Sequence, residues 1–257
     1  MIVSSAVITG ASSGLGREYF DLVVNNFEDI DEIWIISRSK DKLDALAKSI
    51  DTDKKTVIAV YLDLSDEKSY ETLAKVFEMR RPDIRLLINN AGYGNLKNFD
   101  ELSSDEIIST VKLNALGLTL MTEVCLPYMG EDSFILNVSS IGSFAPTPKM
   151  SVYCATKAYV SSLSVALSEE LIDRGITVTA VCPGPMETNF FEAGKINVGD
   201  SKRFASLPRE NTREIAEKSL KAAMKGKRTF TNKLYYRAYR VLSKILPDDM
   251  VLSLSKL

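Results

Sequence analysis

The 257-residue sequence contains no histidine. This absence excludes Ser-His-Asp and Cys-His catalysis, metal sites with imidazole ligands and imidazole pH switches. The three cysteines, Cys125, Cys154 and Cys182, are widely spaced and too few for a zinc site of four thiolates. We therefore expect no metal site, and we expect a reducing, cytoplasmic compartment.

A strong charge imbalance and long apolar runs are also missing. The 32 Lys and Arg nearly balance the 34 Asp and Glu, whereas proteins that bind nucleic acid are normally basic. Residues 1–9 lack the charged start of a signal peptide, and no apolar run approaches the ~18 residues that a membrane span needs. We expect a soluble protein without a nucleic-acid partner.

Short runs rich in Val, Ile and Leu alternate with longer helical segments. Consecutive apolar positions indicate strands buried on both faces, as in a parallel sheet. Strands are predicted at residues 6–9, 32–37, 56–61, 85–89, 133–138 and 177–181, and helices at 14–26, 40–49, 66–79, 104–126, 153–174, 212–224 and 233–246. The alternation predicts an α/β fold over residues 1–257: one Rossmann-type domain with a doubly wound parallel sheet and helices on both faces.

The pattern breaks beyond Gly184. The segment of about residues 185–210 contains glycine, proline and phenylalanine residues at intervals. We interpret this segment as a substrate lid. Residues 225–257 form a basic tail with eight Lys and Arg, two Asp and Glu, and interleaved aromatic residues. Such a tail can contact a membrane surface or an acidic partner. We favour the alternative, a solvated basic face whose aromatic side chains pack on the domain.

A glycine-rich loop, Thr9-Gly10-Ala11-Ser12-Ser13-Gly14-Leu15-Gly16, follows the first strand and opens a helix. Glycines there allow a tight turn and let the backbone approach a pyrophosphate at the helix N-terminus. An ordinary βα turn is the alternative, but the βα unit that follows favours dinucleotide binding.

With its GxxxGxG spacing, the loop resembles that of the short-chain dehydrogenase/reductase family, and the resemblance covers residues 3–190. Further family motifs follow in order: Asp63-Leu64, Asn89-Asn90-Ala91-Gly92, Asn114, Ser140, Tyr153-xxx-Lys157, and Pro183-Gly184 with Thr188. The resemblance implies an oxidoreductase that transfers hydride between a nicotinamide and a carbonyl or alcohol.

Four residues resemble the family's catalytic set. Tyr153 would act as the general acid/base, and Lys157 lies one helical turn away on the same face. An ammonium near the phenol favours phenolate, which would lower the pKa of Tyr153. The resemblance implies that Ser140 holds the substrate oxygen, and that Asn114 interrupts its helix and anchors a water in a proton relay through Lys157. We assign Ser139 a plain capping role.

The resemblance also implies a set of cofactor contacts. Asp63 would accept a hydrogen bond from the adenine amino group, and the residues after the fourth strand would lie along a ribose that Lys157 also binds. The predicted contacts are Gly10, Ser12, Ser13, Gly14, Leu15, Gly16, Ser37, Arg38, Asp63, Leu64, Asn90, Ala91, Gly92, Tyr153, Lys157, Pro183, Gly184, Met186 and Thr188.

The end of the second strand favours NADP(H) over NAD(H). NAD enzymes place a carboxylate there, which would repel a 2′-phosphate. Here Ser37 ends the strand and Arg38 follows, with a guanidinium suited to phosphate. If Arg38 is instead an ordinary surface charge, both cofactors should serve equally.

The candidates for the substrate pocket are residues 93–96 and 142–145, Met186 and the lid from Phe190 onward. Their apolar character favours a hydrophobic ketone or aldehyde as substrate. Two alternatives stay open: a reductase of carrier- or CoA-bound 3-oxoacyl groups, and a catalytically idle dinucleotide sensor. Residues 158–168 carry no charge, which favours burial of that helix in a homodimer or homotetramer.

Overall fold

The computed structural model describes residues 3–50, 55–186, 188 and 207–255. Seven parallel strands form one sheet in the order β3-β2-β1-β4-β5-β6-β7. The strands are β1 (Ser4–Thr9), β2 (Glu32–Ser37), β3 (Thr56–Tyr61), β4 (Asp83–Asn89), β5 (Phe134–Val138), β6 (Thr177–Val181) and β7 (Thr229–Phe230). The order reverses between β1 and β4, which creates a crevice at the carboxyl ends of these strands.

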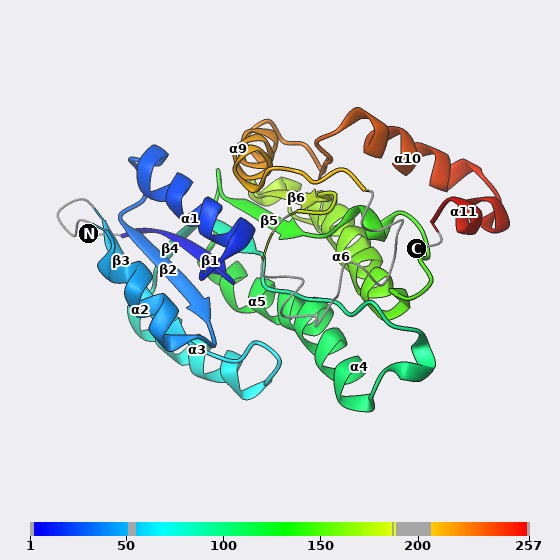
Figure 1. Cartoon of the computed structure of the whole chain (residues 1–257). Coiled ribbons are helices and arrows are strands. Elements are labelled where there is room, and N and C mark those ends of the chain that lie inside the picture. Colours follow the sequence, from blue (N-terminus) through cyan, green and yellow to red (C-terminus); the bar gives the residue numbers. More distant parts are fainter. Residues whose placement is uncertain (1–2, 51–54, 187, 189–206, 256–257) are drawn as a thin grey trace.

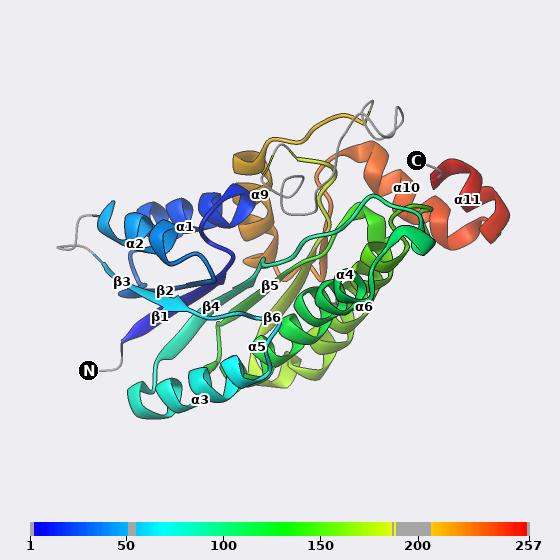
Figure 2. The same cartoon turned by 60° about the horizontal axis from the view of Figure 1, so that its bottom comes forward.

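Helices cover both faces of the sheet (Figures 1 and 2). One face carries α1 (Gly14–Asn26), α2 (Lys40–Lys48) and α9 (Thr212–Ala223). The other carries α3 (Lys68–Arg80), α4 (Ser104–Val111), α5 (Leu118–Cys125) and α6 (Ser151–Glu170). The prediction of a doubly wound Rossmann-type sheet is confirmed. Two further helices, α10 (Leu234–Ile245) and α11 (Asp248–Ser255), lie at the end of the molecule away from β3.

The core has one apolar layer on each side of the sheet. In β2, Ile33 and Ile35 join the layer that contains Phe20 of α1, because alternate side chains of a strand point to opposite faces. Trp34 joins the other layer, where its ring meets Phe77 of α3 edge-on at 5.2 Å. The edge strand β3 is only half-buried, so the predicted burial on both faces holds for the inner strands.

One strand and one helix were not predicted from the sequence. β7 contains two residues and pairs with β6 through Ala180 and Thr229, and such a short strand leaves no periodic pattern. α11 follows Pro247, beyond the last predicted helix. The predicted lid is described only at its two ends, because residues 187 and 189–206 lie outside the described part of the chain.

The predicted helix over residues 104–126 is interrupted. A π-helical segment, Lys112–Gly117, separates α4 from α5 and contains Asn114. By length and composition the helical run Ser104–Tyr128 could also span a membrane, although no apolar run of that length was expected. Met121 and Cys125 of this run are buried in the layer under the sheet, so we interpret it as a core helix.

Candidate active site

A cavity of about 810 Å³ opens at the carboxyl ends of the central strands. Its glycine-loop end is lined by the loops that follow β1, β2 and β4, and its α10 end by residues of α4, α6 and α10. Eighteen predicted site residues line it: Gly10, Ser12, Ser13, Gly14, Leu15, Ser37, Arg38, Leu64, Asn90, Ala91, Gly92, Ser140, Tyr153, Lys157, Pro183, Gly184, Met186 and Thr188. The other three predicted site residues, Gly16, Asp63 and Asn114, do not line it.

Backbone crowding determines the shape of the glycine loop. Gly10 and Gly14 adopt φ values of +67° and +55°, which favour glycine. Gly16 faces the backbone of Gly10 so closely that a methyl group there would lie 2.2 Å from the Gly10 carbonyl oxygen. The first turn of α1 contains no acidic residue, so its N-terminus keeps the positive end of the helix dipole.

Two side chains join the glycine loop to the loop after β4. The Thr9 hydroxyl accepts hydrogen bonds from the backbone N–H groups of Asn90 and Ala91, at 2.9 and 3.0 Å. The Asn90 amide donates to the carbonyl oxygens of Thr9 and Gly10, both at 3.2 Å. Thr9 thus has a structural role at the site that the sequence analysis did not assign.

Arg38 and Asp63 face each other at the glycine-loop end. The guanidinium lies 3.8 Å from Asp63 Oδ2, and its side chain is 68% exposed. Asp63 Oδ1 accepts hydrogen bonds from the Ser65 backbone and hydroxyl. Partial burial opposes ionisation of Asp63, but the Ser65 hydrogen bonds and Arg38 outweigh it and lower the pKa. The predicted adenine acceptor is therefore ionised and lies next to the predicted phosphate ligand.

Tyr153 lies in the first turn of α6 with its hydroxyl in reach of Ser140. Burial raises the pKa of the phenol, and the hydrogen bond with Ser140 opposes that rise only in part. The expected lowering by Lys157 does not dominate: Lys157 Nζ lies 5.8 Å from the centre of the tyrosine ring. In the protein alone, Tyr153 is therefore a protonated phenol at neutral pH.

Lys157 is buried beneath Tyr153. Its side chain donates a 2.8 Å hydrogen bond to the Val138 carbonyl at the end of β5. Burial lowers the pKa of Lys157 to about 8, because a charged amine loses hydration there. The ammonium therefore titrates close to the neutral range.

Asn114 is held rigidly in the π-helical segment. Its amide donates to the Tyr93 carbonyl at 2.7 Å and to the Thr156 hydroxyl at 3.1 Å, and its oxygen accepts from the Tyr93 N–H at 3.0 Å. Gly92 passes between this side chain and Lys157. A methyl group at Gly92 would lie 2.9 Å from Asn114 Oδ1 and 3.2 Å from Lys157 Nζ, so a larger residue would crowd both side chains.

The capping role expected of Ser139 belongs to Ser140. Ser140, not Ser139, caps the short helical turn by accepting a hydrogen bond from the Gly142 N–H. Ser139 is buried and donates to the Lys157 carbonyl at 2.7 Å, which ties α6 to the strand. Cys154 and Cys182 are buried and unpaired, and burial raises the pKa of both thiols, that of Cys154 to about 11.

Gly184 connects the site to the C-terminal segment. Its N–H donates to the carboxylate of Glu210, whose own N–H donates to Pro185. Glu210 is buried, which raises its pKa. A methyl group at Gly184 would lie 2.3 Å from the Tyr236 ring. Neither Glu210 nor Tyr236 was predicted, because only the fold brings them to this loop.

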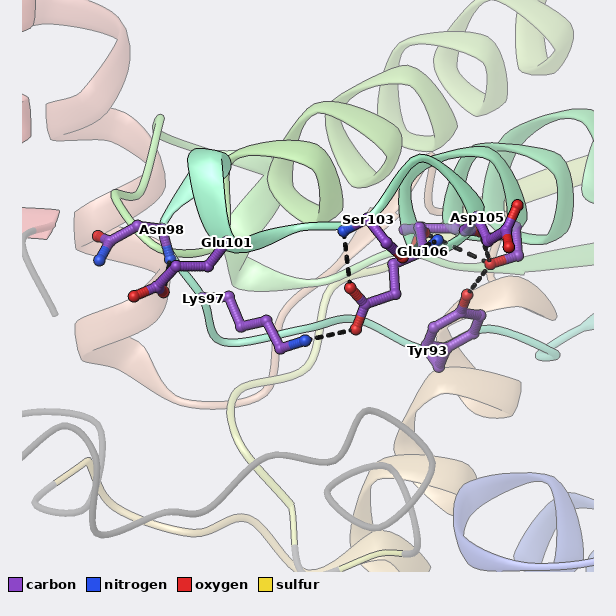
Figure 3. Close-up of polar contacts among 9 residues, drawn as sticks. Tyr93, Lys97, Asn98, Glu101, Ser103, Asp105 and Glu106 are labelled. Atoms are coloured by element: carbon purple, nitrogen blue, oxygen red, sulfur yellow. Dashed lines mark hydrogen bonds and ion pairs between the residues drawn. The ribbon is translucent and has the colours of Figure 1, made fainter.

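A polar wall closes part of the α10 end (Figure 3). Glu106 of α4 accepts from Lys97 Nζ at 2.6 Å and from the Ser103 N–H at 2.9 Å, and these contacts lower its pKa to about 2. Tyr93 and Ser109 share a hydroxyl hydrogen bond of 2.5 Å. Tyr93, Glu106 and Ser109 all line the cavity, so this wall is more polar than the sequence indicated.

Tyrosines of α10 supply the opposite wall. Tyr235, Tyr236 and Tyr239 line the cavity, and Tyr239 also meets the ring of Phe144 at 6.3 Å. Of the other pocket candidates, Gly142, Asn95 and Met186 line the cavity, whereas Ala145 and Leu96 are buried core residues. Phe190 and the following residues to 206 are outside the described chain. The spacing of the tyrosines at i, i+1 and i+4 was the only sequence signal for this wall.

Comparisons with known proteins agree with this geometry. A family model described as short chain dehydrogenase matches residues 4–199. An uncharacterized oxidoreductase of Staphylococcus aureus strain N315 is 29% identical over 234 residues, which cover 90% of this chain and 96% of that protein. A very-long-chain 3-oxoacyl-CoA reductase of Neurospora crassa is 35% identical over 185 residues, covering 68% of this chain and 54% of the reductase.

Solved structures show the same fold. A short-chain dehydrogenase from Sphingobium yanoikuyae in complex with NADPH matches with a TM-score of 0.79 and 26% identity, covering 95% of this chain and 93% of that one. A short-chain dehydrogenase/reductase from Burkholderia phymatum in complex with NAD matches with a TM-score of 0.82 at 22% identity, covering 94% and 92%. Both nicotinamide dinucleotides thus occur among structures of this fold.

Proposed function

Because this chain belongs to the short-chain dehydrogenase family, we propose that it is an NADP(H)-dependent oxidoreductase that interconverts a ketone or aldehyde and its alcohol. The observation that carries the proposal is the convergence of Ser140, Tyr153 and Lys157 on one cavity that also holds the glycine loop. An idle dinucleotide sensor would not need this polar set around a buried phenol.

The cavity fits a dinucleotide. Its volume is within the range of cofactor sites, and the glycine loop offers backbone N–H groups at a helix N-terminus for a pyrophosphate. The same cavity is lined by that loop, by Gly92 and by Lys157. The glycine loop and Arg38 would hold the adenosine half, and Gly92, Lys157 and Thr188 the nicotinamide half.

The nicotinamide, when bound, supplies or accepts the hydride. Ser140 would donate a hydrogen bond to the substrate oxygen as negative charge grows on it. Tyr153, protonated at neutral pH, would give its proton to that oxygen during reduction and take it back during oxidation. Lys157, with a pKa of about 8, can return a proton to the phenol, and Asn114 fixes the backbone of Tyr93 at the wall of the cavity.

Arg38 supports the choice of NADP(H). It lines the cavity directly after β2, where no carboxylate of that strand would repel a 2′-phosphate. A charge-assisted hydrogen bond contributes ~1.5–3 kcal/mol, which corresponds to a preference of roughly tenfold to a hundredfold. We expect the preference to be moderate, because Asp63 competes for the same guanidinium.

The decisive experiment is NADPH oxidation with a panel of ketones and aldehydes of increasing chain length, repeated with NADH. Turnover with NADPH and weaker turnover with NADH supports the proposal. Binding of NADPH without turnover across the whole panel would favour a sensor.

A 3-oxoacyl reductase is the second candidate, favoured by the similarity to the Neurospora crassa reductase. The same panel separates the two functions when it includes 3-oxoacyl thioesters. A rate that rises steeply with acyl length and thioester attachment supports the second candidate. Equal rates on simple ketones support the first.

We also propose that the enzyme forms a homo-oligomer in a reducing, cytoplasmic compartment. The uncharged stretch of α6 leaves Tyr159 and Val165 exposed, and α4 leaves Ile108 and Val111 exposed. Apolar side chains on two neighbouring helices are suited to burial against a second subunit. Sedimentation at micromolar concentration tests this, with Val165→Asp as the variant expected to dissociate.

A further inference from the structure

The helix α10 packs with its apolar side outward. Leu234, Val241 and Ile245 are 79%, 57% and 72% exposed, and their spacing at i, i+7 and i+11 places them on one face of the helix. The opposite face carries the buried Tyr236, together with Tyr239, against the cavity and Phe144. A surface helix normally buries its aliphatic face, so this orientation is reversed.

The reversed face lies on a projecting part of the molecule. α10 and α11 extend from the end farthest from β3 in both views (Figures 1 and 2). Leu242, 45% exposed, borders the stripe and widens it. We call Leu234, Val241, Leu242 and Ile245 the α10 patch. Four exposed aliphatic side chains on one helix form a continuous surface, unlike the scattered apolar residues of ordinary protein surfaces.

Positive charge borders the α10 patch. Arg237 and Lys244 lie three residues after Leu234 and Val241, on the flank of the same face, and both are exposed. Neither forms an ion pair with a carboxylate in the part of the chain that the structure describes. Residues 225–257 carry a net charge of +6, whereas the whole chain carries −2. The C-terminal segment that contains the α10 patch is therefore more positive than the chain as a whole.

We propose that the α10 patch is a binding surface for an anionic lipid bilayer. An amphipathic helix with aliphatic residues on one face and Lys and Arg beside them inserts its apolar face among the headgroups and holds anionic lipids with its charges. A second copy of the chain fits less well, because α10 helices packed antiparallel across a two-fold axis would bring Arg237 of one copy near Lys244 of the other. The tyrosines of the same helix line the cavity, so a bound bilayer would lie beside the cavity.

Vesicle co-sedimentation tests this proposal without using enzyme activity. The wild type should bind vesicles of phosphatidylcholine mixed with phosphatidylglycerol, and bind pure phosphatidylcholine at least about tenfold more weakly. Leu234→Ser/Val241→Ser/Ile245→Ser should weaken binding by about tenfold or more. Arg237→Gln/Lys244→Gln should weaken it by a similar factor and remove most of the salt dependence.

The matched control is Met79→Ser/Ile172→Ser, which removes two exposed apolar side chains from other helical segments, 78% and 58% exposed. It should bind like the wild type, and all variants should keep the wild-type thermal midpoint. The proposal is overturned if the wild type does not bind anionic vesicles or if the triple serine variant binds equally. It is also overturned if that variant changes the oligomeric state, because a second copy then covers the patch.

Discussion

The two ends of the cavity are built in different ways. At the glycine-loop end, backbone groups approach each other closely, and Thr9 and Asn90 fasten adjacent loops. At the α10 end, side chains from α4, α6 and α10 meet, although more than a hundred residues separate Tyr93 from Tyr239. The first end has little room for substitution. At the α10 end, side chains that line the cavity can be substituted while the strands remain in place. This difference suits a cavity that binds one cofactor at the first end and different substrates at the second.

Tyr153 lies where the two ends meet, and its loss should have the largest effect. Tyr153→Phe removes only the phenolic oxygen, so turnover should fall by about a thousandfold while NADPH still binds. The measurement is kcat together with a fluorescence titration of NADPH. Tyr159→Phe, at an exposed position of the same helix, should keep full activity. A folded Tyr153→Phe protein with a substantial fraction of wild-type kcat would remove this residue from the mechanism.

Lys157 gives the next largest effect, in the pH dependence of stability. Its pKa is about 8 in the folded protein and 10.5 in an unfolded chain, so the unfolded state binds more protons between these values. The free energy of unfolding should therefore rise with pH across this window, by roughly 3 kcal/mol from this group.

Denaturation curves from pH 7 upward for the wild type and Lys157→Met measure this rise. The wild type should gain stability relative to that variant as the pH increases. Relative to Lys75→Met, which changes an exposed position of α3 and keeps Lys157, the wild type should show no such gain. A constant difference between the wild type and Lys157→Met would show that the buried amine is not the titrating group.

Gly16 tests the backbone crowding of the glycine-loop end. Gly16→Ala places a methyl group 2.2 Å from the Gly10 carbonyl oxygen, and such overpacking typically costs about 1–3 kcal/mol. We expect a loss of that size in the free energy of unfolding, with weaker cofactor binding. Gly130→Ala is the matched control, because a methyl group there has no neighbour within 4 Å. Equal stability of the two variants would contradict the crowding argument.

Arg38 tests whether the glycine-loop end selects the cofactor. Arg38→Ala should reduce the ratio of kcat/KM for NADPH over NADH by roughly tenfold to a hundredfold. KM for the carbonyl substrate should stay unchanged, because Arg38 is at the other end of the cavity. Lys48→Ala, exposed in the last turn of α2, serves as the control. A wild type that prefers NADH would show that the assignment is wrong.

Tyr93 gives the smallest expected effect, at the α10 end. Tyr93→Phe removes one hydroxyl hydrogen bond to Ser109 and should change KM for the substrate by only a few-fold, about 1 kcal/mol or less. The affinity for NADPH should stay the same. Tyr128→Phe, which packs against Phe77 away from the cavity, provides the control. A change in NADPH affinity would show that the two ends are coupled.

The same contrast explains what the sequence could predict. The order of strands and helices and the family were predicted correctly, because apolar periodicity and the motif spacing are local in the chain. The glycine-loop end depends on residues next to strand ends, and all of the loop residues predicted there except Gly16 and Asp63 line the cavity.

The parts that were missed depend on distant contacts. Glu106 and Ser109 belong to no motif within the helix predicted over residues 104–126, and only the fold brings them to the cavity. Glu210 had no motif, yet it holds the Gly184 N–H. The direction of the Tyr153 pKa shift was also misjudged, because spacing shows that Lys157 is near but does not show how deeply the phenol is buried.

The π-helical segment at Lys112–Gly117 has a consequence for insertions and deletions. Each residue of a helix turns the chain by about 100°, so removing one residue here would rotate α4 against α5 by that angle. Asn114 would leave Tyr93 and Thr156, or Met121 and Cys125 would leave the core. The π-helical segment thus determines how α4, which lines the cavity, is rotated about the helix axis relative to α5, which packs on the sheet. The number of residues in this segment is therefore fixed, even at positions where the side chain can vary.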